Sequence, residues 1–180
     1  SMSLRRWKDR MVARLLTRYP GLVKRWAGGR DFSAEMAGWR AGPAFTPWTP
    51  LAKPVRECKV ALVTTGGVHL KSQTPFDMEN PDGDPTFREI PGGAAREALT
   101  ITHDYYDHRG ADADLNVVFP HERLAEMAAE GAIGGVSPVH LSFMGHIDKE
   151  LVERLVAETA PAAARRLREA GAEVALLAPA

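Results

Sequence analysis

The sequence predicts an α/β fold: a mostly parallel sheet with flanking helices in Rossmann-like layers, preceded by a helical N-terminal arm. Two observations support this prediction. From residue 58 onward, short apolar runs of strand length alternate with longer amphipathic segments, the pattern of chains that build parallel sheets through helical crossovers. Before residue 50, by contrast, the chain holds all four tryptophans and many arginines. This composition separates the arm from the body.

Composition divides the chain into three regions: a basic helical arm at 1–40, a proline-rich linker at 41–54, and an α/β body at 55–180 that we expect to be incomplete at its C-terminus. The prolines of the linker have no amide hydrogen and so cannot support a regular backbone ladder. The arm is predicted to be an amphipathic helix because apolar residues recur in it at helical spacing, at Leu4, Trp7, Met11 and Leu15.

The charges are unevenly distributed. Residues 1–60 hold 13 Lys/Arg and 4 Asp/Glu, a net charge of +9; residues 61–120 hold 4 and 10, a net of −6; and residues 121–180 hold 6 and 9, a net of −3. The arm can therefore pair with the acidic body of its own chain or with an acidic partner, or bind nucleic acid by stacking of its tryptophans. We favour packing on protein, expect no nucleic-acid partner, and consider a homo-oligomer formed through the arm.

The sequence contains no apolar run of about 18 residues, so no membrane helix is predicted. The positively charged start is not followed by the apolar core of a secretory signal, and we expect a cytoplasmic protein. Cys58 is the single cysteine, which excludes an intrachain disulfide and a multi-cysteine metal site. Its place at the start of an apolar run indicates an inert core thiol.

The body opens with an apolar run at 58–65 that predicts a buried strand, and Gly66 and Gly67 predict a tight turn after it. A glycine pair lets backbone amides approach an anion or substrate, but the spaced glycines and the lysine of nucleotide-binding loops are missing. About thirty residues without a clear period follow. We expect them to form an ordered functional loop, anchored by Phe76, Met78, Phe87 and Ile90.

The rest of the body alternates strand and helix patterns. The expected elements are strands at 98–102 and 114–119, a helix at 121–130 ended by Gly131, a half-buried strand at 139–143, and a long helix at 149–170. Asp148 is expected to cap the long helix, Pro161 to kink it, and Gly171 to end it. The apolar run at 174–177 predicts a buried strand at the edge of the sheet.

Residues 103–108, HDYYDH, are the densest group of polar side chains in the chain. His103 and His108 are five positions apart, so they share neither a helix face nor a strand face. A two-histidine metal site therefore requires a turn between them. Metal ligation, binding of a substrate or partner, and structural hydrogen bonding all remain open from the residues alone.

Three long segments resemble the selenoprotein B family, which comprises the B components of glycine, sarcosine and betaine reductases and the selenoprotein subunit of D-proline reductase. The segments are residues 59–91 (KVALVTTGGVHLKSQTPFDMENPDGDPTFREIP), 99–120 (LTITHDYYDHRGADADLNVVFP) and 136–146 (VSPVHLSFMGH). The resemblance covers about residues 54–180 and leaves out the arm. It implies reductive cleavage of a carbon–nitrogen bond in a small amine or amino-acid-like substrate, with a thiol electron donor or reductase partner subunits.

The resemblance also implies a redox residue, selenocysteine or cysteine, directly after a strand like residues 176–180 (LLAPA). That position lies beyond Ala180, so the chain is expected to be truncated at the redox residue. A selenolate there attacks the α-carbon of the bound amine. No metal and no cofactor are expected within this chain. A pyruvoyl group, found in several members of the family, would come from a partner subunit.

The resemblance carries over to a set of site residues around that missing turn. The candidates are Thr64, Thr65, Gly66, Gly67 and His69, followed by Asp77, His103, Asp104, Asp107 and His108. His69 or His103 can keep a selenolate deprotonated or protonate the leaving amine. The alternatives are that these residues only hold the long loop by hydrogen bonds, that the chain is a non-catalytic scaffold subunit, or that it is a metal-dependent hydrolase.

Overall fold

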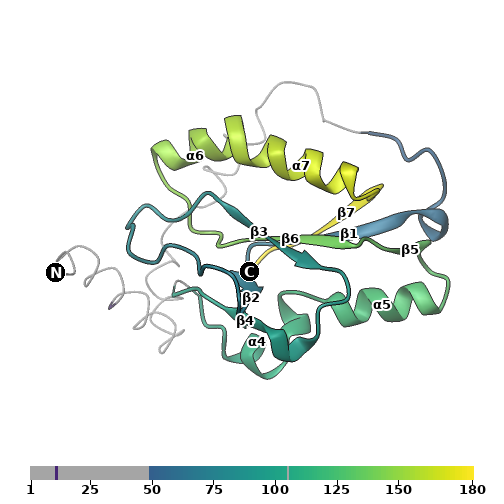
Figure 1. Cartoon of the computed structure of the whole chain (residues 1–180), viewed down its shortest axis with the longest axis horizontal. Helices are drawn as coiled ribbons and strands as arrows, with labels where there is room; N and C mark the ends of the chain where they lie inside the picture. Colours follow the sequence, from purple (N-terminus) through teal and green to yellow (C-terminus); the bar gives the residue numbers. More distant parts are fainter. Residues whose placement is uncertain (1–10, 12–48, 105) are drawn as a thin grey trace, which may run out of the picture.

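The computed structural model describes residue 11, residues 49–104 and residues 106–180. Apart from Met11, the predicted arm at 1–40 and most of the linker therefore lie outside the described residues. The body contains a five-stranded sheet with helices on both faces and a separate two-stranded sheet, as Figure 1 shows. This architecture confirms the predicted α/β class.

The central strand of the main sheet is β1 (Lys59–Thr64), which has parallel neighbours on both sides. Along one side of β1 run the short strand β5 (Gly135–Val136) and then β6 (Val139–Phe143). Along the other side runs β7 (Val174–Ala178), paired with β1 from Val60↔Val174 to Thr64↔Ala178. Strand β3 (Phe87–Pro91) lies antiparallel on the outer side of β6, so the sheet is mixed.

Two helical layers cover the sheet (Figure 1). On one face lies a long helix made of α6 (Glu150–Arg154), a π-helical turn (Leu155–Thr159) and α7 (Ala160–Glu169). On the other face lie α4 (Arg109–Ala113) and α5 (His121–Ala129). Three short 3₁₀ helices complete the body: Val55–Glu57, Arg96–Ala98 and Leu115–Val117.

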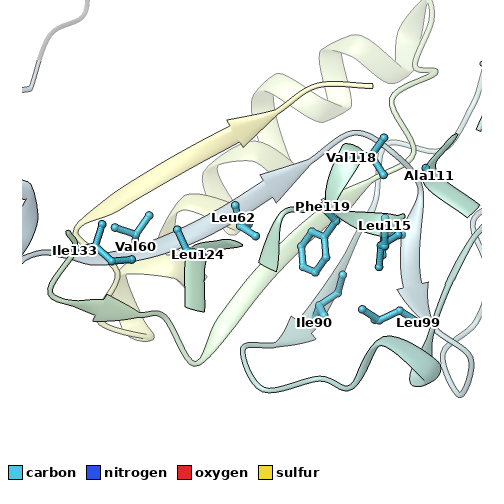
Figure 2. Close-up of a cluster of buried hydrophobic side chains, with 11 residues drawn as sticks. Val60, Leu62, Ile90, Leu99, Ala111, Leu115, Val118, Phe119, Leu124 and Ile133 are labelled. Carbon is cyan, nitrogen blue, oxygen red and sulfur yellow. The ribbon is translucent and has the colours of Figure 1, made fainter. Parts of the chain in front are cut away.

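Successive residues of β1 point into two different cores, as expected for a strand buried on both faces. Ala61 packs toward α7 with Leu141, Phe143 and Leu167. Val60 and Leu62 point to the opposite face, into the larger cluster that Figure 2 shows, where Phe119 and Leu115 lie beside Ile90 and Leu99. Cys58 is almost fully buried just before β1, which agrees with the expected core thiol.

On the side of β1 that pairs with β5 and β6, Ser137 N still donates to Val60 O (2.8 Å), and the ladder is interrupted at Pro138. The carbonyl of Pro138 accepts a hydrogen bond from Gly92 N (2.9 Å) rather than from β1. The imidazole of His140 takes its place: Leu62 N donates to His140 Nδ1 at 3.0 Å, and the ring is fully buried. A side chain thus replaces a backbone carbonyl inside the sheet.

Several expected elements form where the sequence predicted them. The apolar run at the start of the body forms β1, the segment at 98–102 contains β4 (Leu99–Ile101), and the predicted helix at 121–130 is α5. Gly131 and Gly171 adopt positive φ at the ends of α5 and α7, where a residue without a Cβ is favoured. Strand β4 pairs antiparallel with β2 (Val68–Leu70) in the small sheet.

Four expectations were wrong in detail. Residues 114–119 do not form a strand, because the Asp114 side chain accepts from Asn116 N and starts a 3₁₀ helix instead. The segment expected to be a loop contains two strands, β2 at its start and β3, in which the polar pair Arg88 and Glu89 obscured the strand pattern. Strand β6 is buried rather than half-buried, since it lies between β1 and β3. The Asp148 side chain does not cap the long helix; Lys149 is the N-cap residue, with φ of 51°.

The long helix is interrupted by its π-helical turn directly before Pro161. Pro161 has no amide hydrogen to donate to the preceding turn, which is a common cause of such a local change. Strand β7 lies at the predicted edge, but it is not buried: Leu177 is 68% exposed. Among the described strands only β1 pairs with it, so its second edge and much of its two faces remain uncovered. Within the described part of the chain, no helix is long and apolar enough to cross a membrane.

Candidate functional site

Parallel strands β1, β6 and β7 end at the same edge of the sheet, where ligands of open α/β folds commonly bind. The turn after β1, residues 64–67, ties these three ends together. Thr65 N donates to Ala178 O at the end of β7 (3.3 Å), and Gly67 N donates to Phe143 O at the end of β6 (2.9 Å). Ala180 N donates to Thr65 Oγ1 at 3.0 Å. Four of the predicted site residues, Thr64 to Gly67, therefore lie at the meeting point of the strand ends.

The amides of this turn are used inside the protein. Gly66 N donates to Thr64 Oγ1 (3.0 Å), and the same hydroxyl donates to Val118 O (2.7 Å). With Thr65 N and Gly67 N also bonded to strand ends, the three amides of residues 65–67 do not point at an anion site. Glycine is instead required at position 67 by its backbone conformation and by the space available. Gly67 has φ of 69°, and a Cβ there would lie 2.5 Å from Thr102 O.

The segment after β4 lies against this turn. Thr102 N donates to Gly67 O (2.9 Å), and the Tyr106 hydroxyl donates to Gly66 O (3.1 Å). The Tyr106 ring packs edge-on against His103 with ring centroids 4.6 Å apart. These contacts place His103, which is 7% exposed, next to the glycine turn.

Burial controls ionisation at this edge. Desolvation, with the charges of His146 and His108, lowers the pKa of His103 to about 4, while a hydrogen bond with the Met144 backbone and the charge of Asp104 oppose this shift. His103 is thus neutral near pH 7 and becomes protonated only under acidic conditions. Burial also raises the pKa of Tyr106 to about 12, so its hydroxyl keeps the proton that it donates to Gly66.

His69 lies in β2 and is 2% exposed. Its Nδ1 is 2.8 Å from Leu70 O and its Nε2 is 2.8 Å from Thr102 Oγ1. Because a carbonyl can only accept, Nδ1 carries the proton, and Nε2 accepts from the Thr102 hydroxyl in the neutral ring. Nδ1 therefore bonds within β2, and Nε2 bonds to the residue that follows β4, so both ring nitrogens are used inside the fold.

Asp107 and His108 lie on the outer rim rather than beside the turn. Hydrogen bonds from Arg109 (Nε to Oδ1, 2.8 Å) hold the pKa of Asp107 down at about 2. His108 Nδ1 is 2.8 Å from Asp112 Oδ2. Among the described residues, no group of three or more His, Cys, Asp or Glu side chains is arranged to hold a metal ion.

Asp77 lies in the long loop and organises its turns. Its Oδ1 accepts from Glu79 N (2.8 Å) and Asn80 N (3.2 Å), and its own amide donates to the buried carboxylate of Asp84. The loop is ordered, and Phe76 and Ile90 anchor it in the interior as expected. The next segment of the loop contacts the residues that follow β6.

Two residues at this edge were not among the predicted candidates: Tyr106 and His146. Tyr106 belongs to the HDYYDH cluster, but only the fold reveals its bond to Gly66. His146 follows β6, and its Nε2 is 3.0 Å from Pro81 O in the long loop. The rule that located Thr64–Gly67, that polar residues after a parallel strand face the ligand edge, would also have found His146.

The fold and site define an α/β protein in which three parallel strands end at an edge carrying His103, Tyr106 and His146. Over 130 residues the chain is 36% identical to D-proline reductase subunit gamma of Acetoanaerobium sticklandii. The match covers 72% of this chain and 52% of that protein, so the chain spans about half the length of this relative. This likeness supports a relationship to a reductase family. No family model and no solved structure matches the chain.

Proposed function

We propose that the chain is a subunit of a reductase complex of the proline-reductase type, which cleaves a carbon–nitrogen bond of a small amino-acid-like substrate. The observation that carries this proposal is the 36% identity to D-proline reductase subunit gamma over 130 residues. Such a reaction takes two electrons and two protons from a dithiol, which becomes a disulfide. The broken bond then ends as C–H and N–H.

The geometry of the strand ends supports this role in one respect. A thiol or selenol must lose a proton before it can act as a nucleophile. His103 is buried and neutral, with a pKa of about 4, and it lies against the same turn that bonds to Ala180. The proposal places the reactive sulfur or selenium after Ala180, as the resemblance implies, with His103 as a weak base at that edge, which suits only a thiol or selenol whose own pKa is lowered.

The second candidate function is a non-catalytic scaffold subunit of the same complex. The observation that favours it is that the amides of residues 65–67 and both ring nitrogens of His69 are already bonded within the fold. In that case the turn holds the strand ends for a partner that supplies all the chemistry.

Activity of the natural protein, isolated with its partner subunits, separates these two functions. We would supply a dithiol and test D-proline, glycine, sarcosine and betaine in parallel, and compare the wild type with His103→Gln. Catalysis by this subunit predicts turnover of one substrate and a loss of about 100-fold in kcat/KM in the variant. Unchanged turnover in the variant would favour the scaffold. No turnover of any substrate would reject the reductase proposal.

The redox residue is tested separately by mass spectrometry of the natural protein. A peptide that continues beyond Ala180 with selenocysteine or cysteine in the following turn is expected. A sequence with neither residue there would reject this part of the proposal and leave the fold-based part unaffected.

A further inference from the structure

A groove lies between α7 and the first residues of β7. Its volume is about 220 Å³, and it is lined by Ala164, Leu167 and Arg168 of α7 and by residues 172–175. Most of these side chains are small or aliphatic, so the groove is an apolar hollow on the surface of the body. Because Val174 pairs with Val60 near the start of β1, the groove lies at the end of the strands opposite the candidate site.

The basic side chain at the groove suits an aromatic occupant. Arg168 belongs to the last turn of α7, and its side chain is exposed. Its neighbour Arg166 is paired with Glu89 (2.9 Å), whereas Arg168 forms no ion pair with another described residue. A guanidinium stacks favourably on the face of an aromatic ring, and an apolar hollow beside it accepts the body of the same ring.

The chain that enters the body is held at the rim of this groove. Glu173, which lines the groove, lies 2.8 Å from Lys53 Nζ and accepts from Lys59 N at 2.9 Å. Glu173 N donates in turn to Lys59 O (2.9 Å). The Cys58 thiol is 3.6 Å from Lys53 O and 3.4 Å from Pro54 O. These contacts fix the position of Lys53 beside the groove.

An aromatic side chain of the same chain is within reach of this anchor. All four tryptophans precede residue 50, and Trp48, which lies outside the described residues, is five positions before Lys53. Five residues span at most about 17 Å when fully extended. Pro50 disfavours a helix in this stretch, since its φ is fixed and it has no amide hydrogen. So short a tether gives the indole a high local concentration at the groove.

We propose that the groove between α7 and β7 is the docking site of Trp48, whose indole packs on Ala164 and Ala175 and stacks against Arg168. The docked tryptophan attaches the basic arm to the body and leaves the candidate site open. The charges agree with this attachment, because residues 1–60 carry a net charge of +9 and residues 61–180 a net charge of −9. The inference goes beyond the proposed function and does not depend on it.

The first test is fluorescence of the full chain with Trp48 as its single tryptophan. The other three are replaced by phenylalanine: Trp7→Phe, Trp26→Phe and Trp39→Phe. Acrylamide is expected to quench docked Trp48 about threefold less readily than in the urea-unfolded chain, because the indole is buried. Ala164→Arg fills the groove from an exposed helix position and should abolish this protection. Ala125→Arg, at an exposed position of α5, is the matched control and should keep it. Equal quenching in all three proteins would overturn the docking site.

The second test is NMR of the wild-type groove, which requires no substitution there. Nuclear Overhauser effects are expected between the indole of Trp48 and the methyl groups of Ala164 and Ala175. Arg168→Gln removes the guanidinium and should raise the quenching of Trp48 by about twofold. Contacts of the indole with another surface in place of these two alanines would overturn the proposal.

Dilution distinguishes the other possible occupants of the groove. An intrachain tether predicts that the protection of Trp48 does not depend on protein concentration. Protection that is lost on dilution, together with a dimer in light scattering, would assign the groove to Trp48 of a second copy. An exposed Trp48 in the isolated chain, with Ala175 protected from hydrogen exchange only in the complex with its partner subunits, would assign the groove to a partner. Either result would overturn the intrachain proposal.

Discussion

Single residues at the strand ends are constrained by backbone atoms rather than by side chains. Gly67 and Gly131 have nearly the same φ, 69° and 74°, but different surroundings. A Cβ at Gly67 would lie 2.5 Å from Thr102 O, whereas a Cβ at Gly131 would meet no atom within 4 Å. The two positions therefore separate the cost of an unusual φ from the cost of a steric clash.

We expect Gly67→Ala to lower the free energy of unfolding by about 3 kcal/mol or more, because β4 must move away from the turn. Gly131→Ala is expected to cost about 1 kcal/mol, the cost of the φ alone. Urea unfolding of both variants measures the difference. Equal losses would show that the close approach to Thr102 contributes nothing.

Tyr106 joins the HDYYDH segment to the glycine turn and covers His103. In Tyr106→Phe the ring remains, and only the hydrogen bond to Gly66 O is lost, so the pKa of His103 should stay near 4. Tyr106→Ala removes the tyrosine ring and exposes the His103 ring to water. The pKa of His103 should then rise toward its ordinary value of about 6.5. NMR titration of His103 in both variants measures this effect; a pKa that is the same in both would exclude shielding by Tyr106.

At the scale of elements, the long loop behaves as an ordered unit because a buried ion pair organises it. Asp84 is nearly buried and accepts from Asp77 N (3.0 Å) and Thr86 N (2.9 Å). Arg88 in β3 lies 3.5 Å from the Asp84 carboxylate, donates to Thr74 O and Pro75 O, and stacks over the Phe76 ring. One guanidinium thus binds both ends of the loop.

Arg88→Lys is expected to loosen the loop without unfolding the sheet, because an ammonium cannot make these several directed contacts at once. Hydrogen exchange in residues 72–86 should become faster, while exchange in β1 and β6 should stay the same. Arg165→Lys, on α7, serves as the control. Faster exchange throughout the body would instead mean that Arg88 supports the whole fold.

The sequence predicted a helix or strand best where its apolar periodicity agrees with the position of that element in the fold. It located β1, β4, α5 and the long helix, because the apolar residues of each recur at the spacing of its own strand or helix. It failed at 114–119, where one hydrogen bond from Asn116 N to Asp114 decided the local structure. It also failed at β3, because the polar residues of this strand gave no sign that it pairs with β6. The exposure of Leu177 depends on which strands lie beside β7, which no local pattern reports.

The same distinction holds for the site. The turn after β1 and His103 could be located, because the ends of parallel strands meet at one edge. The internal bonding of His69 and the approach of Gly83 to His146 could not, since each joins segments far apart in the sequence. Residue type and spacing indicate which groups are present but not which atoms their hydrogen bonds already use.

At the scale of the whole molecule, two buried imidazoles, those of His103 and His140, oppose protonation. Burial lowers the pKa of both His103 and His140 to about 4, in His140 with the help of the neighbouring His121 charge. In the unfolded chain each of these histidines binds a proton with a pKa of about 6.5. Between pH 6.5 and 4 the unfolded chain is therefore protonated at both rings, whereas the folded protein is not. Stability is thus complete above pH 6.5 and is lost as the pH falls from about 6.5 to 4.

We expect the free energy of unfolding to drop by on the order of 2–3 kcal/mol for each of these two histidines between pH 7 and pH 4. Urea unfolding at several pH values in this range measures how steeply the free energy of unfolding changes with pH. In His140→Gln, whose amide oxygen can still accept from Leu62 N, the slope should fall by about half. A slope that is unchanged in this variant would mean that His140 does not titrate on unfolding.

The imidazole of His140 stands in for a backbone carbonyl beside Leu62, and this has a spectroscopic consequence. The amide proton of Leu62, in the middle of the central strand, is bonded to a group that can itself be protonated. One amide signal therefore reports the ionisation of a buried ring. It also lies two residues ahead of Thr64, the first residue of the turn that joins the strand ends, so it provides an internal indicator of order at the candidate site.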